Sequence, residues 1–332
     1  MKLLDWIPLE RLHWYGLSLN PSEGALTLLE QNPHKIDWCL LSQNTNDRAI
    51  RLLEKNIDKI SWSMLSRNPN DRALTLLEQN PGKINWVRLS RNPNDRALDL
   101  LEENKHYICW SELSLNPNDR ALKLIEKNLD KICWYGLSKN TNDRALKLLK
   151  KNPRKIDWTW LSTNTNNRAL TLLEANFNKI DWCSLSLNPN DRALDLLEAN
   201  IDKIYWYHLS RNENDRAVRL LEKNLDNLLD WSYLSLNPND RAVRLLEENM
   251  DKINWQCLSI NLNDRALDLL ETNLDKIDWY VLSQNPLIFV EDYLLLSKQR
   301  TEILREELMA VTWHPNRFTK WCLDTTDEFC ES

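Results

Sequence analysis

One seven-residue pattern recurs along almost the whole chain and constrains its fold more than any other feature. Trp, two variable residues, Leu, Ser, one variable residue and Asn occur in this order twelve times, first at Trp14 and last at Trp279. Successive tryptophans lie 24 residues apart, except between Trp206 and Trp231, where the spacing is 25. A fixed period of this length is typical of solenoids, in which each unit buries its apolar face by stacking on its neighbours.

Within one unit, the sequence predicts a longer helix and a very short one. Residues 48–56 carry one Ala, one Ile and two Leu at helical spacing, with charged residues between them. We expect this helix to start with Asn44 as the capping residue, to have Pro, where present, at its first position, and to end at Asn56 in a left-handed conformation. A helix of about seven residues is expected from Trp62 to Asn68, usually preceded by a capping Asp, Asn or Ser.

These features predict an all-α solenoid, a superhelix of about twelve 24-residue repeats with two helices each, capped at both ends. At ~8–10 Å per helical layer its contour is roughly 100 Å. Residues 1–13 are predicted to form an N-terminal cap, residues 14–286 the repeats, and residues 287–332 a helical C-terminal cap with an acidic tail. The one-residue insertion lies in Leu225–Asp230, in the expected loop between a long and a short helix, where it does not break the domain.

Composition excludes several classes of protein. The four glycines cannot supply a phosphate-binding or dinucleotide-binding loop, so no cofactor is expected. A net charge of -6, with both signs interspersed, argues against a nucleic-acid or membrane partner. The seven cysteines include no Cys-x-x-Cys pair, which favours reduced thiols in an intracellular compartment, and no apolar run is long enough for a signal peptide or a transmembrane helix.

Residues that carry catalysis or bind metals do not occur at suitable spacings. The five histidines are scattered, and none is placed for a metal site or a catalytic triad. His106, with Cys109 and Cys133 nearby in the chain, forms the one cluster of note, and a structural role is the better interpretation of it. We therefore predict no catalytic, cofactor-binding or metal-binding residues, and no enzymatic activity.

The invariant positions of the repeat are expected to build the fold. Trp38, Leu41 and Ser42 cluster on one face of a short helix, so their columns are predicted to form a core with twelve buried indoles. Two asparagine columns, those of Asn44 and Asn56, are expected to bond to neighbouring backbone as ladders.

Ten arginines, one in each repeat from Arg48 to Arg265, form a charged column. One interpretation is a network of ion pairs between neighbouring repeats, and the other is a track for phosphate groups. An Asp precedes the Arg in nine of the ten cases, with Asn167 as the exception, and largely cancels the positive field. The ion-pair interpretation is therefore favoured.

The variable positions of the short helix are the candidate partner-binding face. They lie two and five residues after each tryptophan and point away from the Trp and Leu columns. Aromatic, Arg and aliphatic residues on a rigid repeating surface match the composition of interface hot spots, although tight packing between repeats would also half-bury them. The candidates are Met64, Arg67, Arg88, Arg91, Leu115, Trp160, Leu187, His208, Arg211, Tyr233, Leu236 and Ile260.

The combination of Leu-Ser-x-Asn-Pro-Asn, Ala-Leu-x-Leu-Leu-Glu-x-Asn and Lys-Ile-Asp-Trp resembles a repeat of giant, nucleocytoplasmic large DNA viruses. The segment from His314 to Arg317, with Lys320 and Trp321, resembles the closing motif of the same proteins. The Asp47-Arg48 pair departs from that repeat by lengthening it. The 24-residue period is also similar to leucine-rich-variant repeats, which form a right-handed superhelix. The first resemblance implies a viral origin and little about activity.

The leading hypothesis is therefore a non-enzymatic protein–protein interaction scaffold of viral origin with host or viral protein partners. It is expected in the host cytoplasm or the virion and not among secreted proteins. A virion structural protein, as a minor capsid or internal component, is the first alternative. A modular nucleic-acid-binding repeat protein is the second. The sequence leaves the oligomeric state open.

Overall fold

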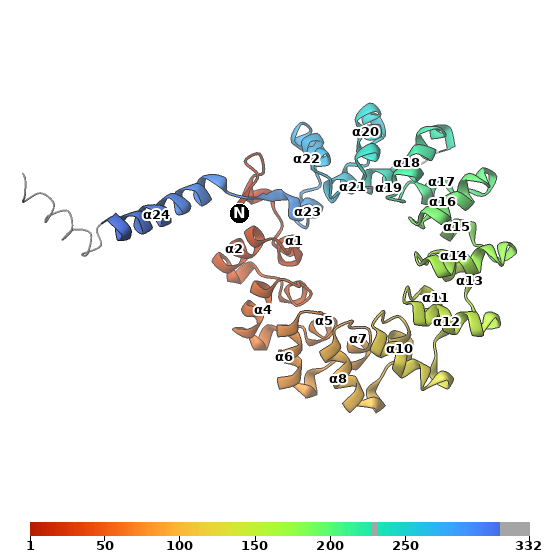
Figure 1. Cartoon of the computed structure of the whole chain (residues 1–332). Coiled ribbons are helices and arrows are strands. Elements are labelled where there is room, and N and C mark those ends of the chain that lie inside the picture. The colour runs from red at the N-terminus through yellow and green to blue at the C-terminus, as the bar shows by residue number, and fades with distance from the viewer. Residues whose placement is uncertain (228–230, 313–332) are drawn as a thin grey trace, which may run out of the picture.

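The helices of the repeats form a closed ring in the computed structural model, which describes residues 1–227 and 231–312 (Figure 1). Eleven repeats each contribute a short helix to the inner side of the ring and a longer helix to the outer side, and the last repeat contributes only the short helix α23. The arrangement is plainest where α1, α5, α7 and α21 lie inside α2, α6, α8 and α22. The predicted all-α repeat solenoid is confirmed.

The short helices begin at the repeat tryptophan in every case except α19, which begins one residue later. They are α1 (Trp14–Leu19), α3 (Trp38–Leu41), α5 (Trp62–Leu65), α7 (Trp86–Ser90), α9 (Trp110–Ser114), α11 (Trp134–Lys139), α13 (Trp158–Ser162), α15 (Trp182–Ser186), α17 (Trp206–Leu209), α19 (Ser232–Leu236), α21 (Trp255–Ser259) and α23 (Trp279–Leu282).

The longer outer helices have eight or nine residues. They are α2 (Glu23–Gln31), α4 (Asp47–Glu54), α6 (Asp71–Gln79), α8 (Asp95–Glu103), α10 (Asp119–Glu126), α12 (Asp143–Lys151), α14 (Asn167–Glu174), α16 (Asp191–Glu198), α18 (Asp215–Glu222), α20 (Asp240–Glu248) and α22 (Asp264–Glu271).

A single turn of 3-10 helix connects each outer helix to the next inner helix, an element that the sequence interpretation placed in a loop. These turns are η2 (Pro33–Lys35), η3 (Ile57–Lys59), η4 (Pro81–Lys83), η5 (Lys105–Tyr107), η6 (Leu129–Lys131), η7 (Pro153–Lys155), η8 (Phe177–Lys179), η9 (Ile201–Lys203), η10 (Leu225–Asn227), η11 (Met250–Lys252) and η12 (Leu274–Lys276); η1 (Leu9–Arg11) and η13 (Pro286–Ile288) lie at the two ends.

The core lies between the inner and outer helices and consists of small and aliphatic side chains. Leu41 from the inner helix and Ala49, Ile50 and Leu53 from the outer helix have no exposed surface, and the equivalent positions are buried around the ring. These positions recur at helical spacing, so each outer helix presents one apolar stripe to the core and its charged residues to solvent.

The tryptophans are less buried than the sequence interpretation assumed. Trp38 and its equivalents are half-buried, and Trp231 alone among the twelve is buried, with 7% of its surface exposed. A lysine of the next 3-10 turn covers several of the exposed ring faces, as Lys59 does at 4.8 Å from the Trp38 centroid. The prediction of twelve buried indoles was therefore wrong, because the first turn of the inner helix lies at the edge of the core.

The helix ends also differ from the prediction in two respects. The outer helix is capped by Asn46, whose Oδ1 accepts a hydrogen bond from the Arg48 backbone at 2.8 Å, and not by Asn44. At the other end, Asn56 has φ -137°, and no described non-glycine residue has a positive φ. Its Nδ2 instead donates to the Leu52 carbonyl at 2.8 Å, so the side chain caps the helix without a left-handed residue.

The predicted side-chain caps of the inner helices are confirmed for every described Asp and Asn at this position, but not for Ser61. Asp37 Oδ1 accepts a hydrogen bond from the Leu40 backbone at 2.9 Å, and Asn85 caps α7 in the same way. Ser61 caps α5 without such a bond.

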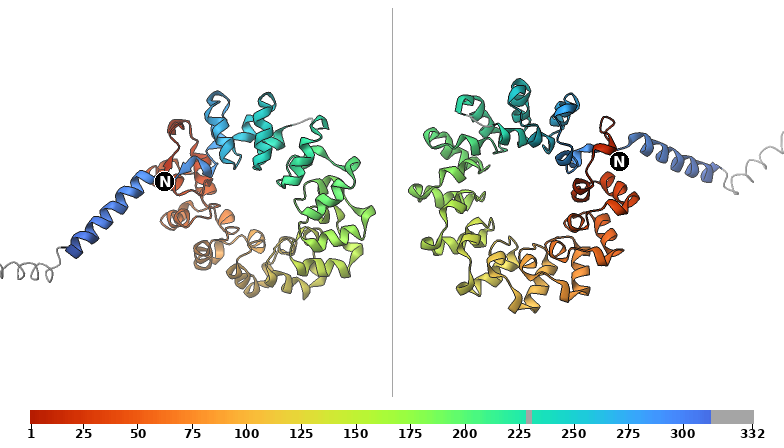
Figure 2. Two further views of the ribbon diagram at one scale, coloured as in Figure 1. Left: turned by 45° about the horizontal axis from the view of Figure 1, so that its top comes forward. Right: turned by 180° about the vertical axis from the view of Figure 1, so that it is seen from behind.

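The two ends of the repeat array meet, which the sequence interpretation did not foresee. β1 (Lys2–Leu3) pairs antiparallel with β2 (Phe289–Val290), with Lys2 opposite Val290 and Leu3 opposite Phe289. Figure 2 shows the first and last repeats side by side from two further directions. The segments predicted as two separate caps are therefore joined to each other, and the array is a ring in place of a superhelix with two free ends.

The segment around the one-residue insertion is described only in part, because residues 228–230 lie outside the described ranges. Asn237 nevertheless donates to the carbonyl oxygen of Asn212 at 3.0 Å, the contact that other adjacent repeats make. The stack thus continues through the insertion, as expected.

The last described helix, α24 (Tyr293–Thr312), projects outward from the ring near the junction of the first and last repeats (Figure 1). Tyr293, Ile303 and Leu308 on it are 76%, 57% and 65% exposed, so the predicted capping role is not fulfilled by this helix. Among the described residues, no helix combines the length and apolar character that crossing a membrane requires. The predicted motif that begins at His314 and the acidic tail lie outside the described residues.

Candidate binding surface

The invariant asparagines form a hydrogen-bond ladder around the ring. Each donates through Nδ2 to the backbone carbonyl of the equivalent asparagine in the preceding repeat, at 2.8–3.0 Å. All twelve are buried: Asn20, Asn44, Asn68, Asn92, Asn116, Asn140, Asn164, Asn188, Asn212, Asn237, Asn261 and Asn285. We call this set the asparagine ladder; it confirms the prediction for the Asn44 column.

The invariant serines join neighbouring repeats in a similar way. Ser42 Oγ donates to the Trp38 carbonyl at 2.7 Å and accepts from the Ser61 backbone of the next repeat at 3.1 Å. Both hydrogen-bonding capacities of the buried hydroxyl are thereby used. The invariant polar residues therefore stabilise the stack and are not available to a ligand.

The arginine column pairs with glutamates of the preceding repeat. Arg72 Nη2 lies 2.6 Å from Glu54 Oε2, and nine of the ten column arginines have a glutamate at the equivalent place. The predicted ion-pair network is thus present, and it occupies the guanidinium groups that a phosphate track would need. Exposed pairs of this kind each contribute only about 0–1 kcal/mol.

The variable residues of the inner helices are the remaining candidates for recognition. Leu41 and Ser42, three and four positions after Trp38, face the outer helix and are fully buried. At 100° per residue, the second and fifth positions after the tryptophan therefore point away from the outer helix, towards the centre of the ring. The first position lies beside them. We call these three sets of positions the inner face.

The structure places all twelve sequence-predicted partner-binding residues on this inner face. Arg67 and Arg211 are exposed, and the other ten are half-buried: Met64, Arg88, Arg91, Leu115, Trp160, Leu187, His208, Tyr233, Leu236 and Ile260. Neighbouring repeats cause this partial burial, since Arg91 lies 3.7 Å from Glu112 and the Arg211 guanidinium lies over the Tyr233 ring. The residues extend along successive inner helices and do not gather into one pocket.

Sequence reasoning missed the first position after the tryptophan, which carries the most exposed aromatic residues of the inner helices. Tyr15, Tyr135, Tyr207 and Tyr280 are 41–46% exposed. The Tyr135 and Trp160 rings meet edge-on with their centroids 5.1 Å apart, and the centroids of the Tyr207 and Tyr233 rings are 4.4 Å apart. A tyrosine at the first position thus touches the residue at the second position of the next repeat. Four tyrosines in this one column were the available signal.

Cysteine and histidine side chains of the described residues are the remaining candidates for catalysis. Cys183 Sγ lies 3.5 Å from His208 Nδ1 on the inner face, but burial raises the pKa of the thiol, whereas a nucleophilic cysteine needs a lowered pKa. His106 packs on Tyr107, and Cys109 Sγ contacts Ser111 Oγ. Within the described residues, no three His, Cys, Asp or Glu side chains are grouped as a metal site.

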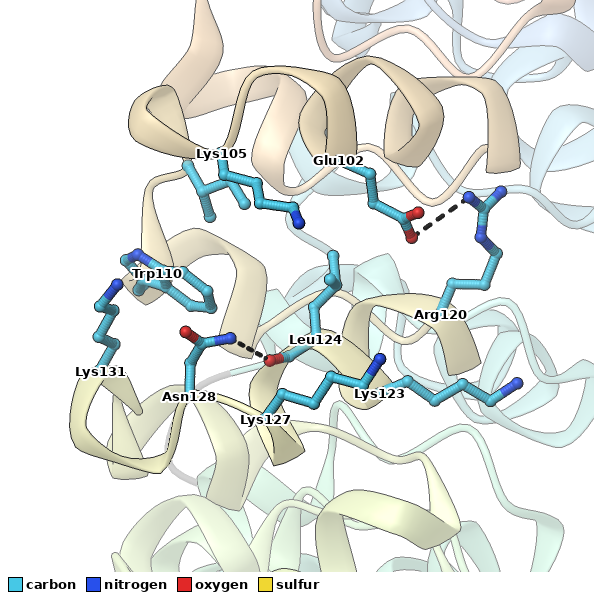
Figure 3. Close-up of a pocket in the computed structure, with 10 residues that line it drawn as sticks. Glu102, Lys105, Trp110, Arg120, Lys123, Leu124, Lys127, Asn128 and Lys131 are labelled. Atoms are coloured by element: carbon cyan, nitrogen blue, oxygen red, sulfur yellow. Dashed lines mark hydrogen bonds and ion pairs between the residues drawn. The ribbon is translucent and has the colours of Figure 1, made fainter.

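A lysine-rich cavity of about 560 Å³ opens between α8 and α10 at the outer side (Figure 3). Lys105, Lys123, Lys127 and Lys131 line it together with Trp110, and Lys131 Nζ lies 4.9 Å from the centroid of the Trp110 ring. Glu102 forms an ion pair with Arg120 across the cavity, at 3.2 Å. This arrangement suits the binding of an anionic group. It is less suited to catalysing a reaction of that group, because the one carboxylate that lines the cavity, that of Glu102, is engaged in the ion pair with Arg120.

Comparison of the chain with protein-family models, with curated proteins and with solved structures finds no significant match.

Proposed function

We propose that this protein is a non-enzymatic scaffold that binds a protein partner through the inner face of its ring. One observation carries the proposal. The invariant side chains form the core, the asparagine ladder and the serine hydrogen bonds, whereas three positions of each inner helix that vary from repeat to repeat lie together on the inner face. A surface that varies on an invariant frame is the usual organisation of repeat proteins that bind other proteins.

The dimensions of the ring suit such a partner. Twelve inner helices at ~8–10 Å per layer give about 30–40 Å between opposite helix axes. Subtracting a helix radius of ~5–6 Å on each side leaves roughly 20–30 Å, and the exposure of Val87, Tyr135 and Tyr207 is consistent with solvent in this space. A single α-helix, about 10–12 Å wide, or an extended chain fits through it.

The aromatic and arginine residues of the inner face are of the types that supply binding energy at interfaces. Tyr, Trp and Arg are enriched at interface hot spots, and Tyr and Trp bury much area with only two side-chain torsions. Contacts such as Tyr207–Tyr233 hold these side chains in place before a partner arrives, which reduces the entropy lost on binding.

Site-specific photocrosslinking tests the proposal. Benzoylphenylalanine replaces Tyr135 or Tyr207 on inner helices, and Tyr107 or Phe177 in 3-10 turns serve as controls of matched type and exposure. We expect one partner to crosslink from the two inner positions and not from the two controls. A partner captured from the control positions alone would contradict the assignment of the inner face.

The resemblance to giant-virus repeats supports a viral origin and a place of action in infected cytoplasm, which we include in the proposal. Infected cells are therefore the source of lysate for the crosslinking. A virion structural role remains the alternative, and quantitative proteomics of purified particles separates the two. Abundance at the level of capsid components favours the structural role, and absence from particles favours the scaffold.

A further inference from the structure

The ion-pair ladder of the outer helices is interrupted at one place. The residue that pairs with the arginine of the next repeat is Glu in every outer helix except α12, where it is Lys150. Arg168 therefore faces a lysine where nine other column arginines face a glutamate. Its side chain is 57% exposed, compared with 28–42% for those nine.

A second acidic position is lost in the same interval. The first residue of the outer helix is Asp or Glu in all repeats except at Asn167, at the start of α14. Asn190 donates to Asn167 Oδ1 at 2.8 Å, so the amide preserves the hydrogen bond of the aspartate column without its charge. The hydrogen-bonding frame is thus retained while negative charge is removed.

The positive charges around this break surround a cavity. Lys147, Lys150 and Arg168 line a space of about 290 Å³ between α12 and α14, and its apolar lining comes from Leu146, Leu172 and Ala175. Among the described residues, the one carboxylate in an ion pair with these three cations is that of Asp143, 3.0 Å from Arg168 Nε. The cavity therefore has an excess of positive charge.

Further cations extend the positive surface on both sides. Lys151 follows in α12, Arg154 and Lys155 follow in η7, and all three are exposed. On the preceding outer helix and turn, Lys123, Lys127 and Lys131 line the cavity of Figure 3. Two cationic cavities with apolar lining thus lie on the outer side of the ring, with α10 and α12 between them.

Lys150 and Arg168 carry like charges at a position where all the other column arginines face a glutamate. Repulsion between these two side chains destabilises the protein when no ligand is bound. Natural proteins tolerate such local violations chiefly at functional sites, where a ligand compensates for them. We propose that this outer surface, centred on Lys147, Lys150 and Arg168, binds a short acidic protein segment in which carboxylate side chains flank an apolar side chain. The carboxylates pair with the lysines and Arg168, and the apolar side chain enters the cavity against Leu172.

A nucleic acid fits this surface less well. Its phosphates would pair with the cations, but they would leave the lining of Leu146, Leu172 and Ala175 without an apolar partner. A long polyanion would also be repelled by the rest of a chain whose net charge is -6, whereas a short segment contacts only the positive region.

Fluorescence anisotropy with the full chain tests the proposal. The probes are a fluorescein-labelled peptide with Glu and Asp around a central Leu, the same peptide with the Leu replaced by Ser, and a single-stranded oligonucleotide of equal charge. We expect the Leu peptide to bind most tightly at low salt concentration. Tighter binding of the oligonucleotide, or no binding of the Leu peptide, would overturn the proposal.

Two variants locate the site. Lys150→Glu restores the glutamate opposite Arg168, so it should fold with an unchanged or raised Tm while it weakens binding of the Leu peptide about tenfold or more, since the local charge changes by two units. Lys55→Glu makes the same change of net charge at the end of α4 and should leave binding unaltered. Equal affinity of the wild type and Lys150→Glu would show that the peptide binds elsewhere and refute the assignment.

Discussion

Asn20 Nδ2 donates to the carbonyl oxygen of Asn285 at 3.0 Å, although 265 residues separate them in the chain. The same contact joins Asn44 to Asn20, only 24 residues apart. The interface between the first and last repeats thus repeats the interface between neighbours, so the asparagine ladder closes on itself. A ring of this kind lacks the exposed terminal repeats that an open solenoid must cap.

The ladder should contribute strongly to stability. Asn164 makes hydrogen bonds to the carbonyls of Ser138 and Asn140 and accepts one from the Asn166 backbone, all at 3.0 Å. Asn164→Ala leaves buried groups unpaired, so we expect a loss of ~2–4 kcal/mol in the free energy of unfolding. Urea denaturation measures it, with Asn178→Ala, at an exposed position, as the control. Equal stability of the two variants would show that the asparagine ladder does not stabilise the fold.

Asn20→Ala examines closure by the same means. In a closed ring, Asn20→Ala should lower the free energy of unfolding about as much as Asn164→Ala does. The reason is that Asn20 also donates to two backbone carbonyls, those of Ser283 and Asn285. At a free end of the stack these two acceptors would be absent, and the substitution would cost about 1 kcal/mol or less. Denaturation curves of the two variants, compared side by side, distinguish the cases.

The helical repeat was predictable from sequence because its causes are local. The spacing of Ala49, Ile50 and Leu53 predicts the outer helix, and the Asp37 column predicts the start of the inner helix. The placement of the candidate partner-binding residues on one face also follows from the 100° step of the helix. These inferences need no knowledge of how one repeat is turned relative to the next.

Ring closure was not predictable in this way, since it depends on a small rotation per repeat accumulated over twelve units. The sequence feature most directly related to ring closure is Gly24. This residue takes the place of the column arginine in the first outer helix, and Phe289 occupies the space beside it, with Cδ1 2.2 Å from where a Cβ would lie. The sequence shows the missing arginine but not the distant phenylalanine that explains it.

Gly24→Ala should destabilise the ring. In an exposed helix this change stabilises by up to ~1 kcal/mol, but here the new Cβ would collide with the Phe289 ring, and we expect a loss of about 1–3 kcal/mol. Gly82→Ala is the control, because nothing lies within 4 Å of its Cβ. Adding Phe289→Ala to Gly24→Ala should abolish the clash penalty, and its persistence in the double variant would show that the penalty has another cause. Thermal unfolding provides the comparison.

The tryptophans should differ in their contributions. Trp231 is 7% exposed, whereas Trp158 is half-buried. We expect Trp231→Ala to cost ~3–5 kcal/mol, as for a core aromatic residue, and Trp158→Ala to cost roughly 1.5–3 kcal/mol. Urea denaturation ranks them, and a larger loss for Trp158→Ala would be inconsistent with the observed burial.

Acid should weaken the ion pair between Glu23 and Arg48. Hydrogen bonds from Arg48 and Asn46 hold the pKa of Glu23 below its ordinary value of 4.5. A carboxylate whose pKa is lower in the folded than in the unfolded state stabilises the fold at pH above the ordinary pKa, and this contribution is lost as the pH falls through the folded pKa.

We therefore expect Glu23→Gln to lower stability at neutral pH by less than about 1 kcal/mol, because the side chain is half exposed. The difference from wild type should shrink as the pH falls below 4.5 and the Glu23 carboxylate becomes protonated. Thermal unfolding over a series of pH values from neutral to acid measures it, and a difference that grows on acidification would have the wrong sign.

Disulfide trapping at the junction tests the closed ring most directly. Lys2 lies opposite Val290 in the antiparallel pair, where Cα atoms are about 4.5–5.5 Å apart, within the range that a disulfide requires. Lys2→Cys with Val290→Cys should form an intramolecular bond rapidly under mild oxidation, identified by mass spectrometry of the linked peptides. A closed ring predicts near-complete linkage in the monomer, whereas free thiols or only intermolecular bonds would show that the ends do not meet.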